Sequence, residues 1–129
     1  MHKMCSTGQM ASLRGALVTC QLACETCSVA CPAIVQPGTS DCSDTCRCCA
    51  HLCQAAQHCW NTPNQVPVLQ AVSHSCRVCL EVCGACGCKA CRKCAAASAT
   101  VLQQLLIFFG NAGHRPAHRV SGLCQTPAS

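Results

Sequence analysis

Cysteines recur along this chain at the spacing of an α-helix. Three sets of four are separated by three or four residues each: Cys20, Cys24, Cys27 and Cys31; Cys42, Cys46, Cys49 and Cys53; and Cys76, Cys79, Cys83 and Cys86. An α-helix turns once every 3.6 residues or so, hence each set forms a stripe along one helix face. In a helix bundle these positions normally carry Leu and Ile. The spacing therefore predicts helices whose buried faces carry thiols, an arrangement suited to soft metal ions.

The amount of cysteine raises the question of disulfides. The chain has 129 residues, enough for one domain, and 19 of them are cysteine. Such enrichment is typical of small secreted disulfide scaffolds. However, residues 1–8 lack the apolar stretch of a signal peptide, no segment looks long enough to span a membrane, and the cysteine count is odd. We therefore expect a cytoplasmic protein with free thiols.

Turn and capping signals divide the chain into four helical segments. Pro32 is expected to end or kink the first segment, because proline lacks the amide hydrogen that a helix interior needs. The second segment runs through its cysteines to about Trp60. Thr62 then caps the third segment, whose first helical residue is Pro63.

Glycine separates the third segment from the fourth. Gly84 and Gly87 disfavour helix, although the sequence also permits one continuous helix here. Gly110 ends the fourth segment. Residues 111–129 have no helical period and predict a flexible tail, which leaves 1–110 as the bundle domain. The fourth segment adds three cysteines to the candidate set: Cys88, Cys91 and Cys94.

Short loops force consecutive helices to run in opposite directions, so the predicted fold is an all-α, antiparallel up-down-up-down four-helix bundle. The cysteines occupy the C-terminal halves of the first and third helices and the N-terminal halves of the second and fourth. They therefore meet at one end of the bundle as a Cys-lined core. The other end collects apolar residues: Leu13, Leu17, Leu69, Val72, Val101, Leu102 and Leu105.

Soft metals differ in how they use thiolates. Zinc takes discrete tetrahedral groups of four ligands, and a continuous stripe does not divide into obvious fours, although two helices together could build them. Cu(I) accepts low coordination by sulfur, so neighbouring thiols can share ions. At one to two thiols per ion, the fifteen stripe cysteines would hold roughly 7 to 15 Cu(I) ions. The sequence thus favours storage of multiple copper ions.

Two other metal chemistries remain open. Cys24-x2-Cys27-x3-Cys31-Pro32 matches the last part of the ferredoxin cysteine run, which binds iron–sulfur clusters for electron transfer. The cysteines from Cys88 to Cys94 match its first part, but position 98 is Ser and neither run is complete. A zinc-thiolate protein with a buffering or structural role is the second alternative.

The repeated pattern Cys-x3-Cys-x2-Cys-x3-Cys in residues 20–31 and 42–53 resembles that of the bacterial cytosolic copper storage proteins, a family of cysteine-rich four-helix bundles. The stretch from Cys76 to Cys83 is similar to the family's third-helix motif, and the resemblance spans about residues 10 to 100. It implies Cu(I) packed inside each bundle by cysteine, often in a homotetramer. Two features depart from the family: the glycine-rich turn at 84–87, and a fourth helix without cysteine after Cys94.

Some soft or titratable residues fall outside the stripes. Three histidines are predicted to lie on the surface: His51, His58 and His74. Of these, His51 is a candidate for passing ions inward, because it lies among the cysteines of the second helix. Four cysteines are predicted not to be core ligands: Cys5, Cys48, Cys59 and Cys124.

Charge and composition exclude several function classes. The net charge is +5, but no basic run is longer than Arg92-Lys93 and aromatic residues are few, so we expect no nucleic-acid partner. With four acidic residues, no phosphate-binding loop and no nucleophile–base pair, we expect no enzyme. The expected partners are copper ions and a copper chaperone or chelator, without a membrane. Cations among the cysteines favour the metal-binding thiolate: Arg47, Arg77, Lys89, Arg92 and Lys93.

Overall fold

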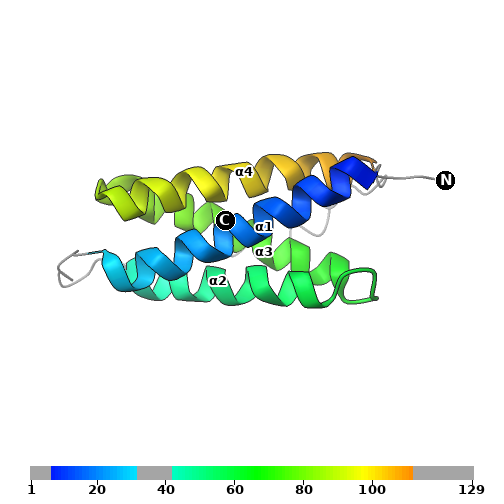
Figure 1. Cartoon of the computed structure of the whole chain (residues 1–129), viewed down its shortest axis with the longest axis horizontal. Coiled ribbons are helices and arrows are strands. Elements are labelled where there is room, and N and C mark those ends of the chain that lie inside the picture. The colour runs from blue at the N-terminus through cyan, green and yellow to red at the C-terminus, as the bar shows by residue number, and fades with distance from the viewer. Residues whose placement is uncertain (1–6, 32–41, 112–129) are drawn as a thin grey trace.

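A computed structural model describes residues 7–31 and 42–111 of the chain, which form four α-helices (Figure 1). No strand occurs within these ranges. The predicted all-α four-helix fold is therefore confirmed. The helices are α1 (Thr7–Ala30), α2 (Cys42–His58), α3 (Gln65–Cys86) and α4 (Lys89–Asn111).

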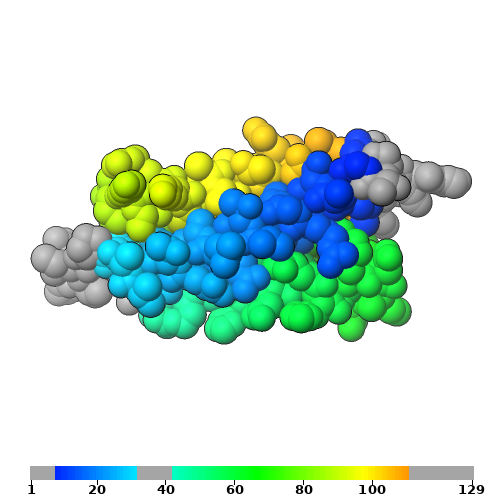
Figure 2. Space-filling view, in the orientation of Figure 1, coloured from blue at the N-terminus to red at the C-terminus, as the bar shows by residue number. Residues whose placement is uncertain are grey.

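Each helix packs along two neighbours: α1 contacts α2 and α4, and α3 contacts the same two helices. The sulfur contacts give the relative directions of the helices. Cys20 of α1 lies near Ser98 of α4, whereas Cys27 lies near Cys91, so α1 and α4 run in opposite directions. The end of the bundle where α1 and α3 finish and α2 and α4 begin carries the cysteines and lies on the left in Figure 1 and in the space-filling view of Figure 2.

The opposite end of the bundle is apolar, as predicted. Leu17, Leu69 and Val101 are fully buried there, and Leu102 is partly buried. Phe108 and Phe109 extend this core, with their rings edge to face at 5.2 Å. We call this part the apolar end. Its buried side chains provide a core that does not depend on metal.

The predicted start of the third helix is wrong by two residues. The Thr62 hydroxyl accepts from the Asn64 amide at 3.2 Å, as a capping residue does, and donates to the Cys59 carbonyl at 2.6 Å. The Thr62 carbonyl, however, accepts from the Gln65 amide, three residues on, at 3.0 Å, and the helix itself begins only at Gln65. These hydrogen bonds form a tight turn that places Pro63 before the helix. Likewise, α2 ends at His58, two residues before Trp60.

The turn between α3 and α4 is shorter than the two glycines suggested. The α3 helix continues through Gly84, while Gly87 ends it in the left-handed conformation at φ 84°. Cys88 lies between the helices, and the expectation that it belongs to the fourth helix is wrong. It caps α4 instead. The Cys88 Sγ accepts a hydrogen bond from the Cys91 backbone amide at 3.3 Å, and the Cys88 carbonyl accepts one from the Arg92 backbone amide at 2.9 Å.

Several expectations concern residues beyond the described ranges. Pro32, Cys5 and Cys124 lie outside them, as does the predicted tail from residue 112 onward. At its C-terminal end, α4 continues through Gly110 to Asn111. The helix therefore extends one residue past the predicted domain boundary.

The expectation that no segment is long enough to cross a membrane needs correction. The stretch Lys89–Gly110 has the length and mean hydropathy of a membrane span. The core helix of a soluble protein can meet the same criteria. In the structure this helix contributes Cys91, Cys94 and Val101 to the bundle core.

Candidate metal centre

The structure brings all fifteen predicted cysteines together, twelve of them inside the bundle and three at one of its ends. Cysteine sulfurs from different helices lie 3.3 to 3.8 Å apart, as between Cys42 and Cys91 or Cys49 and Cys76. No disulfide joins any two of the seventeen cysteines in the described segments. We call the fifteen the thiol column. Twelve of them are buried: Cys20, Cys24, Cys27, Cys42, Cys46, Cys49, Cys53, Cys76, Cys79, Cys83, Cys91 and Cys94.

Within the column, the sulfurs form groups of four in which all atoms lie within 4.8 Å of one another. Every column cysteine belongs to at least one group. From the apolar end outward, these groups are Cys20/Cys49/Cys53/Cys76, Cys24/Cys46/Cys79/Cys94, Cys27/Cys46/Cys83/Cys94, Cys27/Cys31/Cys42/Cys91 and Cys31/Cys86/Cys88/Cys91.

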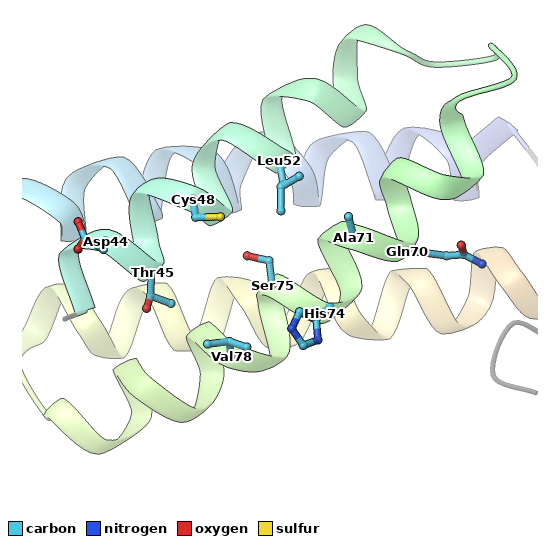
Figure 3. Close-up of a pocket in the computed structure, with 9 residues that line it drawn as sticks. All are labelled: Asp44, Thr45, Cys48, Leu52, Gln70, Ala71, His74, Ser75 and Val78. Atoms are coloured by element: carbon cyan, nitrogen blue, oxygen red, sulfur yellow. The ribbon is translucent and has the colours of Figure 1, made fainter. Parts of the chain in front are cut away.

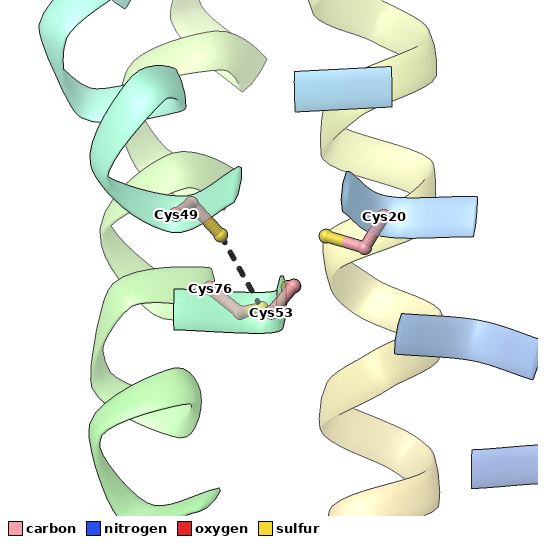
Figure 4. Close-up of side chains that lie close together, drawn as sticks. All are labelled: Cys20, Cys49, Cys53 and Cys76. Carbon is pink, nitrogen blue, oxygen red and sulfur yellow. Dashed lines mark hydrogen bonds between the residues drawn. The ribbon is translucent and has the colours of Figure 1, made fainter. Parts of the chain in front are cut away.

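The innermost group stands apart from the others because it shares no cysteine with them. Cys20 of α1 points toward Cys49 and Cys53 of α2 and Cys76 of α3 (Figure 4). All four residues are completely buried. The fourth helix provides Ser98 here; its Oγ lies 3.7 Å from the Cys20 sulfur, and it is also completely buried.

Ser98 is the residue of this centre that the sequence analysis did not recognise. It continues the three- and four-residue spacing of Cys91 and Cys94, so its inward position could have been predicted from the same periodicity. The sequence places Ser98 on the fourth helix after Cys94 but gives it no role at the metal centre. The structure places its hydroxyl beside a thiol of the column.

The other groups are linked through shared sulfurs. Cys46 and Cys94 each belong to two groups, as does Cys27. The connecting distances are short: 3.4 Å between Cys46 and Cys83, and 3.5 Å between Cys27 and Cys91. An ion held by one group would therefore have ligands of the next group within reach.

The column opens to solvent at its outer end. Cys86 is exposed, Cys31 and Cys88 are half-buried, and their sulfurs lie close together, with 3.7 Å from Cys31 to Cys86 and 3.6 Å from Cys31 to Cys88. We call these three residues the mouth. Among the described cysteines of the column, Cys86 is the most accessible to an incoming ion.

Thiol–thiol hydrogen bonds shift the acidity of the sulfurs in both directions. The hydrogen bond from Cys24 lowers the pKa of Cys20 to about 5, and the same contact raises the pKa of Cys24. A hydrogen bond with Cys46 lowers the pKa of Cys83 to about 7. Burial raises the pKa of Cys91. The metal-free column therefore combines thiolates with thiols that donate to them.

The Cys88 sulfur has a different environment. Its pKa is lowered first by the hydrogen bond from the Cys91 backbone amide. The amide lies at the N-terminus of α4, where the helix dipole also favours negative charge. Cys88 is thus a mouth residue whose thiolate is stabilised by the backbone.

Of the residues predicted to lie outside the core, those that the structure describes do so. Cys48 is exposed and Cys59 half-buried, and neither joins a group of the column. His51, His58 and His74 are exposed. Cys48 and His74 line a groove of about 610 Å³ between α2 and α3, on the outside of the bundle (Figure 3).

Positive charge lies outside the column. Every Lys and Arg in residues 8–31 and 42–110 is exposed. Arg47, for example, forms an ion pair with Asp44 at 2.8 Å. The thiolates of the inner groups therefore have no buried Lys or Arg beside them among these residues, and bound metal would have to balance their charge.

No protein family, curated protein or solved structure matches this chain in the three comparisons made with it. The resemblance to the copper storage proteins consequently rests on cysteine spacing alone.

Proposed function

We propose that this protein stores and sequesters multiple Cu(I) ions through the cysteine thiolates of the column. The observation that carries the proposal is the packing of fifteen cysteine sulfurs, twelve of them from buried residues, into one continuous column. Thiolate is the ligand that Cu(I) prefers. A protein of this kind would act in the cytoplasm, receive copper from a chaperone or chelator, and keep free copper low.

The sharing of ligands supports copper over zinc. A structural zinc site needs four ligands of its own. Outside the innermost group, the remaining four groups draw on only eleven cysteines and overlap in five of them: Cys27, Cys31, Cys46, Cys91 and Cys94 each serve two groups. Low-coordinate Cu(I) tolerates such sharing, because one sulfur can bridge two ions.

Charge balance supports the same choice. A zinc ion with four thiolates leaves a net charge of −2, which is costly in a buried site without a cation. One Cu(I) ion for each thiolate leaves no net charge. The column lacks buried Lys or Arg among the described side chains, so monovalent ions suit it better. This balance favours the upper part of the range of roughly 7 to 15 ions.

The geometry suggests how the column fills. An ion would bind first at the mouth and then move inward by exchange between neighbouring sulfurs 3.3 to 3.9 Å apart. Each thiol that binds copper loses its proton, so uptake releases protons and weakens in acid. The apolar end keeps the empty bundle folded while the column fills.

Anaerobic titration of the reduced chain with Cu(I), against a competing chelator, tests the proposal. We expect uptake of at least about 7 ions before the chelator retains copper. Saturation after one or two ions would contradict storage. The matched control replaces an off-column thiol: Cys48→Ser should keep the capacity, whereas Cys46→Ser should lower it.

Iron–sulfur and zinc chemistry give different results in simple measurements. A four-iron cluster places its own iron and sulfide between the ligand sulfurs, and sulfurs within 4.8 Å of one another suit single ions better. Labile sulfide with a visible absorption band in the purified protein would favour the electron-transfer alternative. Zinc that stays bound when Cu(I) is offered would favour the zinc alternative.

A further inference from the structure

The mouth is the part of the thiol column that a copper donor can reach. Cys86 is exposed and Cys88 half-buried, whereas Cys20, Cys49 and Cys76 of the innermost group are completely buried. A donor molecule must therefore deliver its ion at the outer end. The charges around this end decide which donors are attracted.

Three exposed cations lie beside the mouth, in the first two turns of α4. Lys89 directly follows Cys88, and Lys93 lies one helical turn further on. Between them, Arg92 donates from Nη1 to the Gly87 carbonyl at 2.6 Å, which holds its guanidinium at the turn next to Cys88. We call these three residues the cationic rim.

Negative charge near the mouth is weaker. Asp44 is paired with Arg47 at 2.8 Å. Glu25 and Glu81 are exposed, and each lies five residues before the end of its helix, about 8 Å along the axis, which is the same separation as that between Lys93 and Cys88. The partial charges of the helix ends offset one another here, because α2 and α4 begin at this end of the bundle and α1 and α3 end there, so the balance is decided by the charged side chains. Among the described residues, positive charge therefore predominates at the mouth.

We propose that the cationic rim docks an anionic, low-molecular-weight thiolate complex of Cu(I), from which Cys88 takes the ion. This inference rests on the proposed storage function and names the chemical class of its donor. A small thiol that carries carboxylates forms such a complex. In a reducing compartment, thiol complexes of this kind keep copper as Cu(I) in solution.

The transfer is a ligand exchange. The bond from copper to the donor sulfur breaks as a bond from copper to the Cys88 Sγ forms. A proton carried by the Cys88 thiol passes to the departing thiolate, and copper stays Cu(I), so no electron moves. Cys31 lies 3.6 Å from Cys88 by sulfur–sulfur distance and can then take the ion inward.

The rate of transfer from Cu(I)–glutathione to the reduced full-length chain, mixed anaerobically, tests this inference. Attraction between exposed charges reaches about 10 Å at 0.1 M salt and raises association rates by about tenfold or more. We expect the transfer rate to fall by about tenfold between low and high salt. At low salt, Lys93→Glu should slow transfer severalfold, and Lys89→Glu/Lys93→Glu should slow it further.

Arg77→Glu is the matched control, because it reverses the same charge at an exposed position on α3. Arg77 lies nine residues before the end of α3, about 14 Å along the axis, so its effect should be much smaller. A second arm uses Cu(I) bound by 2-mercaptoethanol, an uncharged thiol. From this donor, Lys93→Glu and Arg77→Glu should accept copper at equal rates.

Two results would contradict the proposal that the cationic rim docks the copper donor. One is equal transfer rates from Cu(I)–glutathione for Lys93→Glu and Arg77→Glu. The other is an equal slowing of Lys93→Glu with the uncharged donor, which would show an effect on the structure of the mouth. The amount of copper bound at the end of each reaction tests the storage function separately. If Lys93→Glu reaches full copper capacity at an unchanged transfer rate, the docking role of the cationic rim is refuted and the storage function is not.

Discussion

At the residue scale, the boundary of the thiol column is set by one side chain. Ser98 occupies the position on α4 that faces the innermost group, 3.7 Å from the Cys20 sulfur. A hydroxyl is a harder ligand than a thiolate and suits Cu(I) poorly. Below it, α4 continues with Val101 and Leu105, both buried. The column therefore ends at Ser98, where the apolar end begins.

Replacing this hydroxyl by a thiol should lengthen the column. We expect Ser98→Cys to bind about one more Cu(I) ion than the natural chain, because the new sulfur would lie beside the Cys20 group. Ser98→Ala should keep the copper count while losing its hydrogen bond, which costs about 1 kcal/mol of unfolding free energy in the reduced, metal-free protein. Copper titration and urea denaturation measure the two effects. An unchanged copper count in Ser98→Cys would contradict the claim that the Ser98 hydroxyl sets the inner end of the column.

At the element scale, the helices and their buried faces were predictable, and the helix ends were not. The three- and four-residue spacing of the cysteines specifies both a helix and its inner face, so all fifteen thiols were assigned to the core. The ends depend on individual hydrogen bonds. The Thr62 hydroxyl donates a hydrogen bond to the Cys59 carbonyl, and the Cys88 sulfur accepts one from the Cys91 backbone amide. Spacing alone gives no sign of either contact.

The two glycines near the α3–α4 turn should respond oppositely to alanine. Gly87 has φ 84°, a conformation that alanine adopts at a cost of about 1 kcal/mol, so Gly87→Ala should lower the unfolding free energy by that amount. Gly84 lies inside α3, and an added Cβ would meet no atom within 4 Å. Gly84→Ala should therefore stabilise by about 0.5 kcal/mol or more. Urea denaturation of the reduced, metal-free variants would show this difference; a loss of stability in Gly84→Ala would contradict it.

At the scale of the whole molecule, the bundle is polarised, with the thiol column at one end and the apolar end at the other. A buried thiol packs as a small hydrophobe, so both ends contribute to the empty fold. Larger side chains such as Leu17 and Leu69 are completely buried in the apolar end. This division lets the metal content change without unfolding the protein.

Truncation of the apolar end should therefore destabilise the metal-free protein. We expect Leu69→Ala to lower its unfolding free energy by about 2 to 5 kcal/mol, as for other buried leucines. Leu22, which is 56% exposed on α1, is the control; Leu22→Ala should change stability by less than about 0.5 kcal/mol. Thermal or urea denaturation without metal measures both. Equal changes in unfolding free energy for the two substitutions would contradict the claim that the apolar end stabilises the metal-free protein.

The central claim is that the thiol column itself holds the copper. The most direct measurement is a crystal structure of the copper-loaded chain, with anomalous scattering at the copper edge to locate each ion. We predict several ions along the bundle axis from Cys20 to Cys88, each bound by column sulfurs. A single ion at the mouth, or copper confined to outer residues such as Cys48 and His74, would contradict the claim.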